Sequence, residues 1–395
     1  MNPRDQRVIL FKGDVQYGVT NRFIEDMEAA YEEDGQSCVT YDLKEDFDTL
    51  KHKLIDEFSQ AKPLLALGFN AMGQFYVNDK SVYDMVAFPH ISWLVDHPVH
   101  HILRLELPVD PEFRQAHVPD NFGLIATIDR GHKQFIDTSL AQKYGCFFLP
   151  HGGCKARKES EQPRDLNIVF CGTGTSPDAL RNTWKELDAE ELKLLEIGVE
   201  MDGAEENLPT LELVAKLFTE QEQKPNRKLF MRIMQNVERY GRARERLQTL
   251  NILDDAGVKV EVFGKGWGFA NFKNHNVHKE LDFEEALEIF QRSKMSLNAS
   301  SFFTDGAHER IFSSMLNGAI PLTNGSKYLD ELEGFSEVVE KYDHSDLLAE
   351  GARTALENSK ELEEKSAAGK EFSENGHTFG HRAIELRDII FKALQ

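Results

Sequence analysis

Residues 295–323 read MSLNASSFFTDGAHERIFSSMLNGAIPLT, and they carry the pattern of one strand–helix–strand unit. Apolar residues alternate over 295–299, which predicts a strand. Apolar residues then recur at helical spacing over 311–316, and Gly318 stands where a helix C-terminus favours glycine. Residues 319–323 form a second apolar run. This order predicts a parallel βαβ unit.

The same alternation extends over most of the chain. We expect further strands at 7–12, 37–41, 63–68, 90–95, 122–128, 146–149, 166–171 and 258–263. Residues 176–250 contain no convincing strand and are expected to form an all-helical insertion. The sequence therefore predicts an α/β protein with doubly wound parallel sheets, in which ligands lie beyond the carboxyl ends of the strands.

Length and composition are those of a globular, multidomain chain. The chain has 395 residues and a formal charge of −21, which argues against general binding of nucleic acid or docking on anionic membranes. Its four cysteines form no C-x-x-C pair, so reduced thiols are expected. The polar residues 2–7 do not suggest a signal peptide, and no apolar stretch is long enough for a membrane span. We therefore expect a cytoplasmic protein.

The loop before the helix at 311–316 contains candidate anion-binding residues. A helix N-terminus after a parallel strand presents free N–H groups, which favour an anion such as a diphosphate. Gly306 permits close backbone approach, His308 and Arg310 can add charge-assisted hydrogen bonds, and Glu309 can accept from sugar hydroxyls. The alternative is structural: Asp305 caps the helix, Glu309 favours its dipole and Arg310 forms a surface ion pair.

Two further glycine-rich turns follow predicted strands, at 172–175 and 264–267. Strand-end loops of one parallel sheet meet at one edge, so these turns are expected to line the same crevice as the loop at 300–310. Arg181 and Lys265 could then neutralise a leaving diphosphate. Trp267 has two open interpretations, packing in the core or stacking on a base.

In the first half, residues 93–101 read WLVDHPVHH. Asp96 or a neighbouring histidine such as His97 is a candidate general base for an acceptor hydroxyl. A metal site is a rival interpretation, but no H-E-x-x-H is present and Pro98 argues against a regular helix here. The structural alternative is a helix cap at Asp96.

Several separate segments together resemble the glycosyltransferase-like family named after the spore maturation protein CgeB. They are residues 165–174, Arg181, 264–267, 296–298, 306–312, 317–319, Thr323, 377–383 and, in the first half, 93–101. The resemblance implies a GT-B fold, with two Rossmann-like domains facing across a cleft. It also implies that no bound metal is needed.

The resemblance and the predicted elements together give the expected domains. They are an acceptor domain at 1–160, a sugar-nucleotide domain at 161–375 that includes the helical segment, and a C-terminal helix at 376–395 that packs back toward the first domain. Asp96 and His97 are the candidate catalytic residues. The candidate donor-binding residues are Gly172, Thr173, Gly174, Arg181, Gly264, Lys265, Gly266, Trp267, Asn298, Asp305, Gly306, His308, Glu309 and Arg310.

The leading hypothesis is a metal-independent glycosyltransferase that moves a sugar from a nucleotide-sugar donor to a hydroxyl acceptor, such as a protein or a surface glycan. Where many retaining GT-B enzymes carry two Glu residues, this sequence has Asp305 and Ser313. A non-catalytic GT-B scaffold is therefore one alternative, and a sugar-nucleotide epimerase is another. The helical segment 176–250 is a candidate lid, partner surface or contact in a homo-oligomer.

Overall fold

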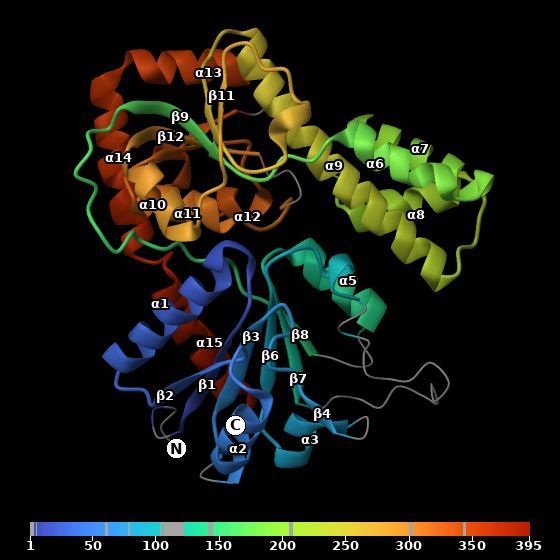
Figure 1. The fold of residues 1–395 in the computed structure, drawn as a ribbon, viewed down its shortest axis with the longest axis vertical. Coiled ribbons are helices and arrows are strands. Elements are labelled where there is room, and N and C mark those ends of the chain that lie inside the picture. Colours follow the sequence, from blue (N-terminus) through green and yellow to red (C-terminus); the bar gives the residue numbers. More distant parts are fainter. Residues whose placement is uncertain are drawn as a thin grey trace. The chain divides into compact units, whose positions relative to one another are not determined.

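The computed structural model of the chain divides into two compact units (Figure 1). It describes residues 4, 6–59, 62–77, 80–102, 105, 122–140, 145–204, 208–299, 303–342 and 345–395. The first unit comprises Met1–Cys154 together with Gly376–Gln395, and the second comprises Lys155–Asn375.

The first unit is built on a six-stranded parallel sheet with the order β2-β1-β3-β6-β7-β8. These strands are β1 (Val8–Lys12), β2 (Cys38–Asp42), β3 (Leu65–Phe69), β6 (His90–Leu94), β7 (Gly123–Thr127) and β8 (Gly145–Phe148). Its α-helices include α1 (Val19–Glu33), α2 (Phe47–Ser59), α3 (Val82–Val86), α5 (Arg130–Leu140) and α15 (Phe379–Ala393). A short antiparallel pair, β4 (Tyr76–Val77) and β5 (Lys80–Ser81), stands apart. All residues of β3 and β6 are buried, as expected for a parallel sheet with covered faces.

The second unit contains another six-stranded parallel sheet, with the order β11-β10-β9-β12-β13-β14. Its strands are β9 (Leu166–Cys171), β10 (Glu261–Phe263), β11 (Asn276–His278), β12 (Ser293–Asn298), β13 (Ile320–Thr323) and β14 (Glu340–Lys341). The helices that follow β11 are α10 (Phe283–Gln291), α11 (Glu309–Leu316), α12 (Lys327–Asp330), α13 (Ser345–Glu357) and α14 (Ser359–Glu374). The predicted α/β class with parallel sheets is confirmed.

The helical insertion is also confirmed. Between β9 and β10 lie α6 (Pro177–Thr183), α7 (Ala189–Ala204), α8 (Thr210–Glu220) and α9 (Arg227–Asp255), and no strand occurs among the described residues of this segment. The N-terminal half of α9 packs with α6, α7 and α8 (Figure 1). Its C-terminal part contributes Leu250 and Leu253 to the hydrophobic core of the sheet. One long helix therefore joins the helical insertion to the sheet. In the described residues, no helix combines the length and apolar composition that a bilayer span requires.

Helix α15 is anchored in the first unit by Phe379. This side chain is fully buried and stacks on Phe23 of α1, with ring centroids 3.9 Å apart. Phe69 and Trp93 lie against the same ring, at centroid distances of 6.3 and 5.7 Å. Figure 1 shows α1 and α15 side by side, and Tyr31 of α1 donates a hydrogen bond to a backbone carbonyl of α15. Phe379 thus ties the C-terminal helix to the core of this unit.

We expect Phe379→Ala to destabilise the first unit by about 3–5 kcal/mol, because it removes a large buried ring and leaves a cavity. Phe379→Leu should lose much less, since most of the volume remains. Leu394→Ala is the matched control on the same chain segment, because Leu394 is 50% exposed. Calorimetric unfolding of the three variants measures the effect. Equal midpoints for Phe379→Ala and Leu394→Ala would contradict the prediction.

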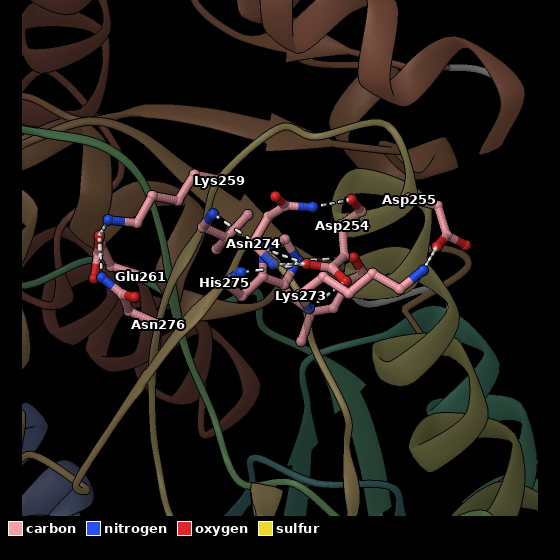
Figure 2. Close-up of polar contacts among 10 residues, drawn as sticks. Asp254, Asp255, Lys259, Glu261, Lys273, Asn274, His275 and Asn276 are labelled. Carbon is pink, nitrogen blue, oxygen red and sulfur yellow. Dashed lines mark hydrogen bonds and ion pairs between the residues drawn. The ribbon is translucent and has the colours of Figure 1, made fainter.

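A buried carboxylate at the end of α9 organises the segment that leads into edge strand β11 (Figure 2). Asp254 accepts hydrogen bonds from the backbone N–H groups of Lys273 at 2.8 Å, Asn274 at 2.7 Å and His275 at 3.2 Å. The Nδ1 atom of His275 accepts from the N–H of Val260, which precedes β10. Burial would raise the pKa of the Asp254 carboxyl, but its hydrogen bonds and the nearby imidazole hold that pKa below its ordinary value.

Asp254→Asn should therefore lower the free energy of unfolding at neutral pH by about 1.5–3 kcal/mol, because it removes charge-assisted hydrogen bonds to a buried acceptor. The contribution of Asp254 is complete above about pH 4, the usual range of a free carboxyl, and is lost as the pH falls through its lowered folded pKa. The difference from the native protein should shrink accordingly on acidification. Asp255 is the control, because its side chain is 74% exposed and faces Lys273 at 3.8 Å. A loss in Asp255→Asn as large as that in Asp254→Asn would contradict this account.

Candidate functional site

The candidate site of the second unit lies at the carboxyl edge of its sheet. Strands β9, β10, β12 and β13 are parallel, so the segments that follow them emerge at the same edge. The described residues of these segments are 172–176, 264–266, 299, 303–308 and 324–326. All of the predicted donor-binding residues except Arg181 lie in these segments or directly beside them.

The two glycine-rich turns after β9 and β10 are in backbone contact. The Gly174 N–H donates to the Lys265 carbonyl at 2.9 Å. A Cβ on Gly264 would lie 2.1 Å from the carbonyl oxygen of Gly172, and one on Gly266, whose φ is +85°, would lie 2.2 Å from that of Gly174. Glycine is therefore required for this approach of one turn to the other. The structure brings these two turns together as expected.

Trp267 supports these turns from the protein interior. Its side chain is 2% exposed, packs edge-on against Phe170 and donates from Nε1 to the carbonyl of Gly172 at 2.8 Å. Of the two interpretations of this residue, the structure has the packed one. Lys265, in contrast, is exposed at the edge of the sheet.

The loop before α11 is hydrogen-bonded to the segment that follows β13. The Ser326 hydroxyl donates to the Gly306 carbonyl at 2.6 Å, and the Lys327 N–H donates to the Thr304 carbonyl at 3.1 Å. The N-cap of α11 is His308, not Asp305 as in the structural alternative, because Nδ1 of His308 accepts from the N–H of Arg310 at 3.2 Å.

Arg310 of the site is buried, which is unusual for a charged side chain. It is only 7% exposed, and its guanidinium lies over the ring of Phe170, 5.6 Å from the centroid. In the described part of the chain its Nη1 has no hydrogen-bond partner. Nor does Arg310 form, within those residues, the surface ion pair that the structural alternative expected. A buried, charged donor of this kind normally costs free energy unless a ligand or partner satisfies it.

Neighbouring groups respond to this positive charge. Burial lowers the pKa of His308; the nearby Glu309 opposes that shift, and the charges of Arg310 and Arg246 add to it. Burial raises the pKa of the Cys171 thiol, at the end of β9, to about 12, although Arg310 works in the opposite direction. The Nδ1 of His308 also contacts a carboxylate oxygen of Glu309. Cys171 is a thiol near neutral pH.

Two of the remaining predicted donor residues, Arg181 and Asn298, have structural partners, although the Nε of Arg181 is buried without a hydrogen-bond partner among the described residues. Arg181 lies within the helical insertion, where it pairs with Glu196 at 3.2 Å and stacks on Tyr240 at 5.1 Å. Asn298 is buried at the end of β12 and donates from Nδ2 to the Thr323 hydroxyl at 3.2 Å. Ser313, the position without the usual Glu, is fully buried in α11.

In the first unit, Asp96 and His97 follow β6 at the carboxyl edge of the sheet. The Asp96 side chain is 47% exposed, and its Oδ2 lies 3.9 Å from Nε2 of His101. His97 is buried, caps a short 3-10 turn through Val99, and packs edge-on against His132 at 4.6 Å. The cap here is His97 and not Asp96, so the acidic side chain is left half-exposed.

Within the residues that the structure describes, no group of three or more His, Cys, Asp and Glu side chains is arranged to hold a metal ion. Independence from metal is a prediction from the resemblance.

One residue of this neighbourhood was missed by sequence analysis. Arg246 of α9 donates from Nη1 to the carbonyl of Thr173 in the turn after β9, at 3.2 Å. Several arginines occur along α9, and the spacing alone does not tell which of them reaches the edge of the sheet.

Comparison with known proteins relates the C-terminal part of the chain to one family. Residues 239–388 match a family model described as glycosyl transferase-like. An uncharacterized protein of Aquifex aeolicus (strain VF5) is 25% identical over 283 residues, which are 68% of this chain and 66% of that protein. The chain thus spans slightly less than two thirds of that relative.

Two solved structures resemble the whole chain. An alpha-glucosyltransferase in complex with UDP-glucose and DNA containing an abasic site aligns with a TM-score of 0.53 and 11% identity, over 98% of this chain and 99% of that one. Sucrose-phosphate synthase from Thermosynechococcus elongatus aligns with a TM-score of 0.50 and 8% identity, over 98% and 99% of the two chains. At these identities the likeness shows the fold, and it confirms the expected GT-B fold class.

Proposed function

We propose that the protein is a glycosyltransferase that takes a sugar from a nucleoside-diphosphate donor bound at the second unit and moves it to a hydroxyl acceptor bound at the first. The glycosyl transferase-like match over residues 239–388 includes the loop and helix that carry Arg310. The observation that carries the proposal is Arg310 itself, a buried guanidinium with an unpartnered N–H in the first turn of α11. Phosphate oxygens would satisfy it.

Residues of the second unit would bind the donor and stabilise its leaving group. Arg310 and exposed Lys265 would hold the negative charge that develops on the departing diphosphate. Glu309, in the first turn of α11, would accept hydrogen bonds from donor hydroxyls. Arg181 receives no part in this proposal, because Glu196 and Tyr240 already engage its guanidinium. No step of this scheme requires a metal ion.

Asp96 would be the general base that removes the acceptor proton. Its half-exposed carboxylate can reach a bound hydroxyl, whereas buried His97 is committed to capping its turn and to packing on His132. The Nε2 of His101 lies 3.9 Å from the carboxylate, and a protonated His101 would attract its negative charge. The proton would pass to Asp96 as the new glycosidic bond forms and the bond to the diphosphate breaks.

Calorimetric titration with nucleoside diphosphates and sugar nucleotides, followed by assays of donor hydrolysis, tests the proposal. We expect one sugar nucleotide to bind and to be hydrolysed slowly without an acceptor. Isolation of an epimerised sugar nucleotide would instead indicate an epimerase. Binding without hydrolysis or transfer to any component of a host lysate would indicate a non-catalytic scaffold. Failure of every nucleotide to bind would refute the proposal.

A further inference from the structure

Two guanidinium groups from separate elements flank the carboxyl end of β9. Arg310 of α11 lies over the ring of Phe170, the penultimate residue of the strand. Arg246 of α9 reaches the same place from the helical insertion and contacts the carbonyl of Thr173. A strand end with one cation is common, but here two cations converge on a few residues of backbone.

Both guanidinium groups keep unsatisfied donors. Over the described ranges, the Nη1 of Arg310 and the Nε of Arg246 are buried and have no hydrogen-bond partner. Neither guanidinium forms an ion pair with a carboxylate in those ranges. Buried donors of this kind are rare in folded proteins unless a ligand or a water molecule completes them.

Arg246 lies near two further positive charges, those of Arg242 and Arg310. Burial lowers the pKa of Arg246 to about 10, and the charges of Arg242 and Arg310 add to that shift. Glu245 and Glu238 oppose it without restoring the ordinary value. Arg242 has a carboxylate beside it, because it lies 3.5 Å from Glu238, whereas Arg310 forms no ion pair within the described residues. An anion with two adjacent charges would relieve the repulsion between Arg246 and Arg310.

We infer that Arg246 and Arg310 bind two neighbouring phosphate groups of one ligand, and that Arg246 is the residue by which the site selects a nucleoside diphosphate over a monophosphate. This rests on the proposed function for the identity of the ligand. A single phosphate group can satisfy Arg310 alone, whereas a diphosphate reaches both guanidinium groups. The helical insertion thereby contributes directly to donor selection through α9.

The test is calorimetric titration of the full chain with the diphosphates and monophosphates of uridine, guanosine, adenosine and cytidine, and with inorganic pyrophosphate. In Arg246→Gln, we expect the affinity for the preferred diphosphate to fall at least about tenfold, because a charge-assisted hydrogen bond is lost. The affinity for the matching monophosphate should fall less than about threefold, since Arg246 acts on it only through a screened, longer-range field. Arg246→Lys should restore part of the preference.

Arg239→Gln is the matched control, because Arg239 lies on the same helix and its side chain is exposed. It removes the same charge and should leave the ratio of the two affinities unchanged. Melting temperatures of both variants are measured in parallel. A purely structural role for Arg246 would lower the melting temperature and change both affinities alike.

The outcomes separate this inference from the proposed function. An unchanged preference in Arg246→Gln, equal losses for both ligands, or no binding of any of these anions by the native protein would overturn the inference. Turnover of a sugar nucleotide by the native protein would sustain the proposed function in each of these cases. Conversely, Arg246-dependent binding of pyrophosphate or a diphosphate without binding of any sugar nucleotide would sustain the inference and refute the proposed function.

Discussion

Replacing Asp96 with asparagine is expected to lower kcat for sugar transfer by about 10²–10⁴-fold, the usual contribution of a general base. The amide has nearly the same shape as the carboxylate but cannot take the acceptor proton. Asp96 is half-exposed and does not cap the turn that follows β6, so the fold should be unaffected. Donor affinity should also be unchanged, because the donor is proposed to bind at the second unit. Steady-state kinetics with saturating donor and acceptor, and calorimetry with donor alone, measure these two quantities.

Asp137→Asn provides a matched control for this experiment. Its side chain lies in the same unit on α5, is 44% exposed, and pairs with Lys133 one helical turn away. Loss of such a surface pair changes stability by about 0–1 kcal/mol and should not affect transfer. If Asp96→Asn retained most of the native kcat, Asp96 would not be the base.

The central strands could be predicted because most of their residues are buried. Such strands appear in the sequence as short apolar runs, as at 7–12, where the predicted strand contains β1, whose first four residues are buried. The glycine expected at a helix C-terminus, Gly318, is an equally local signal, and it follows α11 with a positive φ. Edge strands β11 and β14 have only three and two residues, and their residues are largely exposed, so no apolar run marks them.

The site could be predicted only in part, because its charges are set by contacts between distant segments. The glycine turns after β9 and β10 were identified from their position after strands, and they do meet. The burial of Arg310 depends on Phe170, which lies far away in the sequence, and the approach of Arg246 to Thr173 depends on the path of a long helix. Neither contact leaves a periodic signal in the sequence. The same limit explains Trp267, for which sequence alone left packing and ligand stacking equally open.

Arg310→Gln is expected to lower turnover of the donor by about 10²–10³-fold, because it removes a preorganised donor aimed at the developing charge of the diphosphate. Donor affinity should fall at least about tenfold with the loss of a charge-assisted hydrogen bond. The fold should survive, since the substitution removes a buried charge that lacks a partner among the described residues. Arg310→Lys should recover only part of the affinity, because an ammonium cannot reproduce the bidentate guanidinium.

Arg292 is the control: it forms a surface pair with Asp165 at 2.7 Å, and Arg292→Gln should change stability by about 0–1 kcal/mol without changing donor affinity. Calorimetry and melting temperatures of the three variants decide the matter. If Arg310→Gln binds the donor as the native protein does, the loop before α11 does not belong to the donor site.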